Sequence, residues 1–257
     1  MGSTGECRGL ATGASRGIGF HGARALLRMG CRIVASSRSL ENLRKAFSSF
    51  GRDVLLYEAD LRSERDVEGL MDYALAELGW LDYVFLSYGN PSREPLQVHE
   101  ARWSDWIEAF SMYVASTATI IRRIVEGNPR KSTVFVVSSF TVKEYHPELV
   151  VSDVARHGLY RLVRTASKRY PDKIRGIILE LGSFKTPGAL ETIRRIAEKK
   201  GSSLEEYWSR HVEGLSPLGR AGDLGELEDL VILLARSPEY LTGAVIRFDG
   251  GSACCIE

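Results

Sequence analysis

The sequence lacks an excess of charge of either sign and lacks any long apolar run. Its 257 residues carry 34 basic and 33 acidic side chains, so no overall field favours binding to nucleic acid or to an anionic membrane. No apolar stretch reaches the roughly 18 residues that indicate a transmembrane helix. The N-terminal residues also lack the charged start and apolar core of a secretion signal. We therefore expect a cytoplasmic protein that acts on a small molecule.

Metal-binding patterns and internal repeats are missing as well. The four cysteines, Cys7, Cys31, Cys254 and Cys255, show no metal-ligand spacing, and we expect free or buried thiols rather than a disulfide. The histidines are scattered, so no metal site is predicted; they are His21, His99, His146, His157 and His211. Because there are no repeats and no low-complexity linkers, residues 1–257 are predicted to form a single domain.

Short β-rich runs alternate with longer helical segments along the chain, which predicts a parallel sheet flanked by helices. The expected strands are 7–11, 32–36, 54–58, 83–87, 133–138, 175–181 and 244–248. The expected helices are 18–29, 40–50, 64–78, 101–126, 154–170 and 224–235. Each helical segment is long enough for a right-handed crossover. The predicted fold class is α/β, a Rossmann-type doubly wound parallel sheet of about seven strands with helices on both faces.

Residues 187–217 interrupt this alternation. They are polar and helical, over 191–200 and 204–212, at a place where the next strand would be expected. A helical insertion at this point of the chain lies beside the carboxyl ends of the strands, where ligands bind in open α/β sheets. We therefore predict that about 187–217 form a lid over the substrate.

A glycine-rich turn follows the first strand. Residues 12–19 read Thr-Gly-Ala-Ser-Arg-Gly-Ile-Gly and open a helix. In such a turn Gly13 permits the tight bend, Gly17 lets the backbone approach a pyrophosphate, and Gly19 allows the helix and strand to pack closely. The N-terminus of the helix favours negative charge. The pattern predicts a dinucleotide site.

The spacing of these glycines resembles the short-chain dehydrogenase/reductase family, and further matches follow in order along nearly the whole chain. Asp60-Leu61, after the third strand, resembles the family's adenine-contacting pair, and Gly182 with Thr186-Pro187 resembles its loop after the sixth strand. Segments 217–220 and 242–251 resemble its C-terminal signature.

The resemblance implies further properties of the chain. Thr186 is expected to contact the nicotinamide carboxamide, and a homotetramer or dimer is expected with the helices around Trp106 and Val163 at the interface. The predicted cofactor-binding residues are Gly13, Ser15, Arg16, Gly17, Ile18, Gly19, Ser37, Arg38, Asp60, Leu61, Gly89, Arg156, Gly182 and Thr186.

The end of the second strand decides between the two nicotinamide dinucleotides. An acidic side chain there binds the ribose 2′-hydroxyl, whereas a cation accommodates a 2′-phosphate. The sequence has Ser37 followed by Arg38, and Arg16 in the glycine turn lies on the same side. Two guanidinium groups can hold a phosphate by bidentate hydrogen bonds. We therefore predict that NADP(H) is preferred over NAD(H).

The family's proton-transfer residues are only partly present. The family has a serine after the fifth strand, a tyrosine 13 residues later and a lysine four beyond; here these positions are Ser139, Ser152 and Arg156. The family's asparagine position is Tyr113, and its Asn-Asn-Ala-Gly reads as residues 86–89, Leu-Ser-Tyr-Gly. The pair Tyr160 and Arg164 has the right spacing but lies about 12 Å farther along the helix, so we reject it.

Two functions remain open at this stage. In the first, the chain is an NADP(H)-dependent oxidoreductase acting on a small carbonyl or alcohol: Ser139 orients the carbonyl, Arg156 stabilises oxyanion charge, and an atypical donor supplies the proton. That donor is water or one of Tyr113, Tyr88, Tyr145 and His146, and the predicted catalytic set is Ser139, Ser152, Arg156, Tyr113 and Tyr145. In the second, the chain binds NADP(H) without hydride transfer, as a sensor, a structural subunit or a pseudoenzyme.

Overall fold

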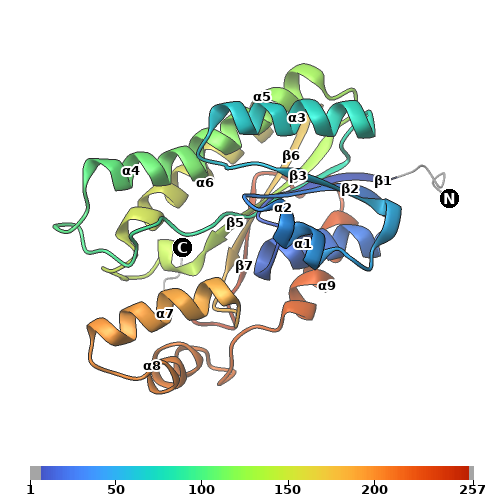
Figure 1. Cartoon of the computed structure of the whole chain (residues 1–257). Helices are drawn as coiled ribbons and strands as arrows, with labels where there is room; N and C mark the ends of the chain where they lie inside the picture. Colours follow the sequence, from blue (N-terminus) through green and yellow to red (C-terminus); the bar gives the residue numbers. More distant parts are fainter. Residues whose placement is uncertain (1–6, 255–257) are drawn as a thin grey trace.

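A seven-stranded parallel sheet forms the centre of the molecule in the computed structural model, which describes residues 7–254 (Figure 1). The strand order is β3-β2-β1-β4-β5-β6-β7. The strands are β1 Cys7–Ala11, β2 Cys31–Ser37, β3 Val54–Glu58, β4 Tyr83–Leu86, β5 Ser132–Ser139, β6 Ile174–Leu181 and β7 Ala244–Phe248. This order is the doubly wound arrangement, and it confirms the predicted fold class.

Helices cover both faces of the sheet (Figure 1). Their bounds are α1 Gly17–Arg28, α2 Leu40–Ala46, α3 Glu64–Leu78, α4 Trp103–Phe110, α5 Ser116–Gly127, α6 Val150–Arg169, α7 Pro187–Lys199, α8 Leu204–His211 and α9 Leu224–Ala235. Side chains cap several of these helices; Ser63, for example, accepts the Asp66 amide at the start of α3. Such caps satisfy amides that the helix itself leaves without partners.

Each face of the sheet has its own apolar core. On one face α3, α5 and α6 contribute buried residues such as Leu70, Ile124 and Leu159, which pack against strand residues of the same cluster. On the other face α1 and α9 contribute residues such as Leu26 and Val231. Because both faces are covered, the central strands are largely apolar on both sides and do not alternate between apolar and polar residues.

Three predicted helices have wrong boundaries. Helix α2 ends at Ala46 instead of residue 50. The single helix expected over 101–126 is divided into α4 and α5 by a π-helical turn at Ser111–Ala115, and such turns frequently mark functional sites. Helix α6 begins at Val150 instead of residue 154. The earlier start places Ser152 and Asp153 within the first turn of α6. The Asp153 amide donates to the carbonyl of Leu149, whereas the Ser152 amide precedes the helical ladder and needs a partner from outside the helix.

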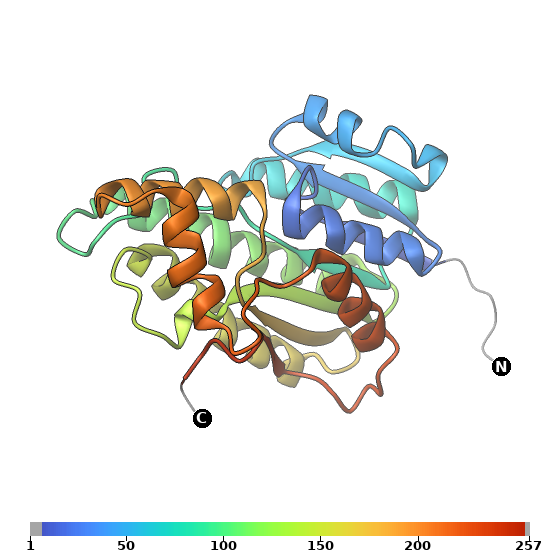
Figure 2. The same cartoon turned by 90° about the horizontal axis from the view of Figure 1, so that it is seen from below.

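Helices α7 and α8 form the segment predicted as a lid, and they lie beside the carboxyl edge of the sheet (Figures 1 and 2). Hydrogen bonds tie α7 to the loop after β4: Asn90 donates to Thr192 over 2.7 Å, and Lys199 donates to the carbonyl of Pro95 over 3.0 Å. The Arg195 guanidinium also donates to the carbonyl of Arg93. The lid segment is therefore held against the β4 loop by polar contacts.

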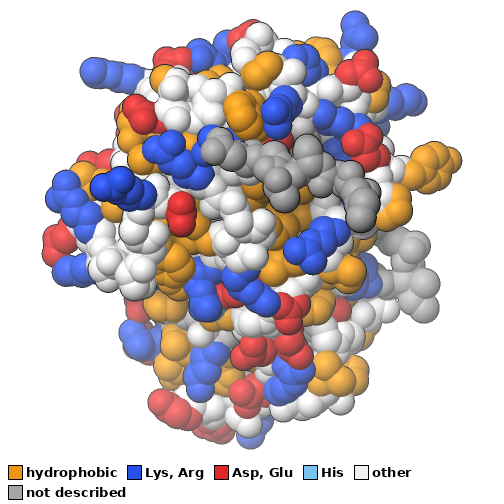
Figure 3. All heavy atoms as spheres, turned by 90° about the vertical axis from the view of Figure 1, so that its right-hand side faces the viewer, with side chains coloured by type: hydrophobic (Ala, Val, Ile, Leu, Met, Phe, Trp, Pro, Cys, Tyr) orange, Lys and Arg blue, Asp and Glu red, His pale blue; other side chains and the backbone are white. Residues whose placement is uncertain are grey.

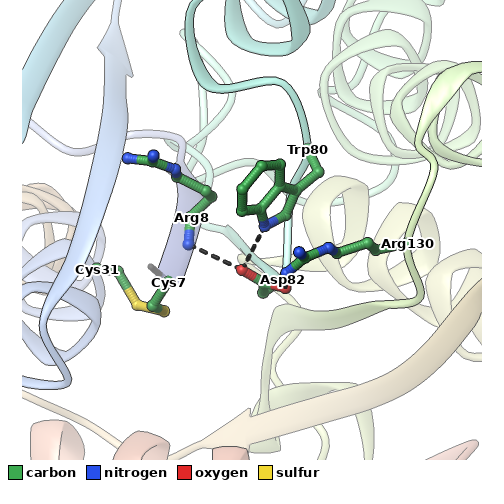
Figure 4. Close-up of a disulfide and its surroundings, with 6 residues drawn as sticks. All are labelled: Cys7, Arg8, Cys31, Trp80, Asp82 and Arg130. Carbon is green, nitrogen blue, oxygen red and sulfur yellow. Dashed lines mark hydrogen bonds and ion pairs between the residues drawn. A yellow bond between two sulfur atoms is a disulfide. The ribbon is translucent and has the colours of Figure 1, made fainter. Parts of the chain in front are cut away.

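A disulfide joins the first residues of two neighbouring strands, so the expectation of free thiols is wrong for Cys7 and Cys31 (Figure 4). The two residues are 24 apart in sequence but lie opposite each other in the β1–β2 register. Asp82 beside them accepts the Arg8 amide and the Trp80 indole N–H, each over 2.9 Å. Cys254 is free and exposed, and Cys255 lies outside the described residues.

On the face shown in Figure 3, basic and acidic side chains are interspersed. Within residues 7–254, no helix is long and apolar enough to cross a membrane, and no group of histidine, cysteine and carboxylate side chains is placed to hold a metal ion.

Candidate functional site

The candidate site lies where the chain reverses its direction along the sheet. Strand β1 pairs with both β2 and β4, so the loops after β1 and β4 diverge from a common point at the carboxyl edge. Ligands of open α/β sheets bind at this point. Thr12 and Ser87 join the two loops, since the Thr12 hydroxyl donates to the Ser87 carbonyl over 2.9 Å and accepts the Ser87 amide over 3.1 Å.

Two glycines of the turn have backbone conformations that favour glycine. Gly13 and Gly17 have φ of +60° and +57°, a region that other L-residues rarely adopt. A Cβ on Gly17 would lie 3.2 Å from Cβ of Thr186, so the turn and the loop after β6 approach each other here. This close approach requires that position 17 have no side chain.

Helix α1 starts in this turn without a cap. Its N-cap residue, Arg16, makes no side-chain hydrogen bond to the first turn, and that turn contains no acidic residue. The first amides of α1 are therefore available to an anion, and the helix dipole adds to their attraction. The uncapped end, the two left-handed glycines and the proximity of Thr186 fit a pyrophosphate.

The ribose end of the predicted site carries two exposed arginines, Arg16 and Arg38. The Ser37 hydroxyl bonds locally to the backbone of Ser39. The Arg38 guanidinium reaches toward the β4 loop, because a Cβ on Gly89 would lie 4.0 Å from its Nη2. Among residues 7–254, neither Arg16 nor Arg38 forms an ion pair with a carboxylate, which leaves both cations available.

Asp60, predicted to contact adenine, is held by a residue that sequence reasoning missed. Arg62 donates to both carboxylate oxygens of Asp60, from Nε over 2.9 and 3.0 Å and from Nη2 over 2.6 Å. Arg62 thereby lowers the pKa of Asp60, and its Nη1 donates to Glu108 on α4 over 2.8 Å. The sequence does place opposite charges at Asp60 and Arg62, directly after β3, and this pattern could have indicated the ion pair.

The remaining predicted cofactor residues lie around the same edge. Gly182 follows β6, and its amide donates to the carbonyl of Phe248 over 2.9 Å. Thr186 caps α7 by accepting the Ala189 amide. Ile18 and Leu61 pack against the apolar cores on opposite faces of the sheet, and Ser15 is half-buried in the glycine turn.

Ser139 ends β5 and takes part in a short chain of hydrogen bonds. Its Oγ is 2.8 Å from the hydroxyl of Thr141, and that hydroxyl is 2.6 Å from Oδ1 of Asp153. Ser139 is half-buried, whereas Thr141 is buried. The chain runs from the partly accessible serine to a carboxyl group in the first turn of α6.

Arg156 connects this carboxyl group with Tyr113. Its Nη1 lies 3.6 Å from Oδ1 of Asp153, and its Nη2 donates to the Tyr113 hydroxyl over 3.0 Å. The guanidinium carbon lies 4.8 Å from the centre of the Tyr113 ring, in the range of a cation–π contact. Helix α6 and the π-helical turn thus bring together Arg156 and Tyr113, two members of the predicted catalytic set.

Ser152 is fully buried and does not face an open space. Its hydroxyl donates to the carbonyl of Leu149 over 3.1 Å, and its amide donates to Oε1 of Glu94 over 3.0 Å. Glu94, on the β4 loop, is only 2% exposed. Burial raises the pKa of Glu94 to about 7, although Arg156 and the Ser152 amide act in the opposite direction. Sequence reasoning missed Glu94 because it lies 58 residues from its partner.

The tyrosines considered as proton donors occupy different places. Tyr113 is fully buried, and its hydroxyl donates to the Gly89 carbonyl over 2.9 Å. Tyr88 is hydrogen-bonded to Thr117. Burial raises the pKa of both phenols. Tyr145 is 88% exposed, while the half-buried His146 packs edge-on against Phe140.

The rejected tyrosine, Tyr160, points to the opposite side of β5. Its hydroxyl is bonded to the buried Glu180 over 2.6 Å and accepts from Ser138 over 3.1 Å. Because side chains alternate across a strand, Ser138 and Ser139 face opposite directions. The geometry therefore separates Tyr160 from the side of β5 that carries Ser139.

Comparison with known proteins agrees with this architecture. Residues 13–253 match the family model described as Enoyl-(Acyl carrier protein) reductase. The Emericella nidulans protein named Short chain dehydrogenase mdpC is 27% identical over 251 residues, which cover 95% of this chain and 94% of that protein. The chain belongs to the short-chain dehydrogenase/reductase family. This membership confirms the resemblance that the glycine spacing indicated.

Two further proteins are similar to this chain over nearly its whole length. NADP-dependent mannitol dehydrogenase from Hypocrea jecorina is 27% identical over 254 residues, covering 94% of this chain and 90% of its own length. The solved structure of a variant actinorhodin polyketide ketoreductase with NADPH has a TM-score of 0.89 at 20% identity, and covers 99% of this chain and 100% of that chain. The chain therefore belongs to an oxidoreductase family, and the similarity extends over nearly all of its fold.

Proposed function

We propose that this protein is an NADP(H)-dependent oxidoreductase that interconverts a small carbonyl compound and its alcohol in the cytoplasm. The observation that carries the proposal is the glycine turn: Gly13 and Gly17 are left-handed, α1 begins without a side-chain cap, and Thr186 lies close to Gly17. These residues fit the pyrophosphate and nicotinamide ends of the cofactor. When bound, NADPH supplies a hydride.

The chain's own residues orient the substrate and balance its charge. Ser139 is the half-buried hydroxyl at the end of β5, and we assign it the hydrogen bond to the carbonyl oxygen. Arg156 places a permanent cation in the first turns of α6 and stabilises negative charge that develops on that oxygen. Tyr113 and Asp153 hold the guanidinium from two sides, which fixes its orientation. Ser152 is buried, and its hydrogen bonds to Leu149 and Glu94 stabilise the start of α6.

Helices α7 and α8 are proposed to cover the substrate. The contacts of α7 with the β4 loop, Asn90 to Thr192 and Lys199 to Pro95, support this proposal. Tyr145 and His146 lie in the loop between β5 and α6. The size of the substrate would be set by this loop and by the lid.

A homo-oligomer is proposed on the basis of an exposed apolar surface. Trp103 is 82% exposed, and Ile107, Phe110 and Val154 are exposed as well; these residues belong to α4 and α6. Large apolar side chains gathered on two adjacent helices mark an association surface. Light scattering of the purified protein distinguishes a dimer or tetramer from a monomer.

Calorimetric titration with NADPH and NADH, followed by NADPH absorbance with a panel of ketones, aldehydes and sugars, tests the function. We expect NADPH to bind and to be oxidised only when a suitable carbonyl compound is added. Tight binding without oxidation by any compound would favour the second function, NADP(H) binding without hydride transfer, for which the burial of Ser152 and Tyr113 is the supporting observation.

The preference for NADP(H) depends on the two exposed arginines. Arg38→Ala should lower NADPH affinity about 10- to 100-fold and leave NADH affinity unchanged, because one charge-assisted contact with the 2′-phosphate contributes about 1.5–3 kcal/mol. Arg44, an exposed arginine in the last turn of α2, provides the matched control, and Arg44→Ala should bind both dinucleotides normally. Equal affinity of the unaltered protein for NADH and NADPH would refute the assignment.

A further inference from the structure

Three oxygen atoms link Ser139 to a carboxyl group inside the protein. Ser139 Oγ and Thr141 Oγ1 are 2.8 Å apart, and Thr141 Oγ1 and Asp153 Oδ1 are 2.6 Å apart. Both distances lie in the range of O–H···O hydrogen bonds. Ser139 is the accessible end of this chain, and Asp153, whose side chain is 13% exposed, is the other end.

The single proton of the Thr141 hydroxyl can be donated in only one direction at a time. When Asp153 is ionised it only accepts hydrogen bonds, so Thr141 donates to Asp153 and Ser139 donates to Thr141. When Asp153 is protonated it donates to Thr141, which then donates to Ser139 and leaves the serine proton free to point at a ligand. The same three residues can therefore donate their hydrogen bonds in either direction along the chain. The two arrangements differ by one proton.

We propose that Asp153, acting through Thr141, is the source and the acceptor of the proton that Ser139 exchanges with the substrate oxygen. The inference rests on the proposed oxidoreductase function and supplies its missing proton donor. Ser139 is the catalytic residue in this scheme, because it touches the substrate. Thr141 and Asp153 act through it.

The proton balance closes in both directions of the reaction. In reduction, the carbonyl carbon gains a hydride from the reduced nicotinamide dinucleotide, and its oxygen takes the Ser139 proton. Ser139 is reprotonated by Thr141, Thr141 by Asp153, and Asp153 is left as a carboxylate. In oxidation, each transfer reverses, and Asp153 becomes protonated as the alcohol loses a hydride to the oxidised dinucleotide.

Several charged and titratable groups face Asp153. Burial raises the pKa of the Asp153 carboxyl, while Arg156, the Thr141 hydroxyl and His146 act in the opposite direction. The carboxyl of Glu94 and the phenol of Tyr113 also interact with Asp153. A carboxyl whose proton is held more tightly than usual is a better donor near neutral pH. Reduction should therefore slow, and oxidation accelerate, as the pH rises through the Asp153 titration.

The other buried groups near Ser139 are engaged elsewhere. The Tyr113 phenol donates to the Gly89 carbonyl and accepts from Arg156. Glu94 accepts the Ser152 amide at the start of α6, which makes it a cap of that helix. The Ser152 hydroxyl is bonded to the carbonyl of Leu149. Only Asp153 has a hydrogen-bonded route to Ser139 among the carboxyl groups that the structure describes.

Asp153→Asn is the first test, because asparagine keeps the shape and can still accept the Thr141 hydrogen bond. The variant should bind NADPH as the unaltered protein does and lose about 10²- to 10³-fold in the rate of carbonyl reduction. Its remaining rate should be independent of pH where the unaltered protein's rate falls. Asp82→Asn, the same change in a half-buried aspartate at the opposite edge of the sheet, should leave rate and pH profile unchanged.

Thr141 tests the connection itself. Thr141→Val interrupts the chain and should reproduce the flat pH profile, whereas Thr141→Ser keeps the hydroxyl and should restore most of the rate. A second readout needs no turnover: the carbon-13 signal of the Asp153 carboxyl, assigned by its loss in Asp153→Asn. In Thr141→Val the pKa of that carboxyl should rise, because the ionised form loses a hydrogen-bond donor.

Four results would overturn the inference. An unchanged pH profile in Asp153→Asn would exclude Asp153 while the oxidoreductase function stands. A flat profile in Glu94→Gln, with the profile retained in Asp153→Asn, would assign the proton to Glu94 instead. An unshifted carboxyl signal in Thr141→Val would disconnect Thr141 from Asp153. Absence of turnover in the unaltered protein, with NADPH bound, would refute the relay and the proposed function together.

Discussion

Gly19→Ala should abolish NADPH binding and lower the free energy of unfolding by about 3 kcal/mol or more, in the range of overpacked or strained positions. An alanine Cβ at this position would lie 2.5 Å from the carbonyl carbon of Gly13 and 2.7 Å from the carbonyl oxygen of Thr12. Both are backbone atoms, so no side chain can move aside to make room. The glycine turn must therefore open, and the first amides of α1 then no longer point toward one anion.

Gly188→Ala is the matched control. Gly188 lies in the first turn of α7, and nothing lies within 4 Å of an added Cβ. Because alanine is the better helix former, this variant should be neutral or more stable by up to about 1 kcal/mol. Urea unfolding and NADPH titration of both variants provide the measurement. Normal binding by Gly19→Ala would show that the cofactor does not rest on this turn.

The alternation of strands and helices predicted the sheet because its signal is local and repeated. A central strand such as Ile174–Leu181 is buried on both faces and is apolar except at Arg175 and Glu180. Each crossover helix has one apolar face. The π-helical turn at Ser111–Ala115 has no such signal, because its residues are as apolar as those of the helices on either side. Helix boundaries that depend on tertiary partners were therefore missed.

The cofactor half of the site follows from sequence, whereas the proton-transfer half does not. The glycine turn is one continuous motif, and its conformation is fixed by residues that adjoin each other. Glu94 and Ser152 are brought together by the β4 loop and α6 across 58 residues, and Cys7 meets Cys31 only through strand register. Thr141 and Asp153 also lie in different elements, 12 residues apart. Pairings of this kind are properties of the folded chain.

The unaltered protein should lose stability as the pH rises, because of Glu94. In Glu94→Gln this loss should be absent. The pKa of Glu94 is about 7 in the folded protein, against an ordinary value of 4.5, because the carboxyl is buried. Between these two values the folded state holds the proton more tightly than the unfolded chain does. The free energy of unfolding therefore falls as pH rises through this window, by about 3 kcal/mol from this group alone. Glutamine has no proton to lose, and its Oε1 can still accept the Ser152 amide.

Urea unfolding at about pH 4 and about pH 8 measures this difference, because the change in stability between the two conditions reports the protons exchanged on unfolding. Glu94→Gln should have a larger free energy of unfolding than the unaltered protein at the higher pH, but not at the lower pH. Glu100→Gln is the control. Glu100 is on the same loop, and hydrogen bonds from the Gln97 amide and Lys199 lower its pKa. Replacing Glu100 therefore cannot raise the free energy of unfolding at the higher pH. If Glu94→Gln instead lost stability at the higher pH, the carboxylate would be stabilised by Arg156 and the Ser152 amide more strongly than burial destabilises it.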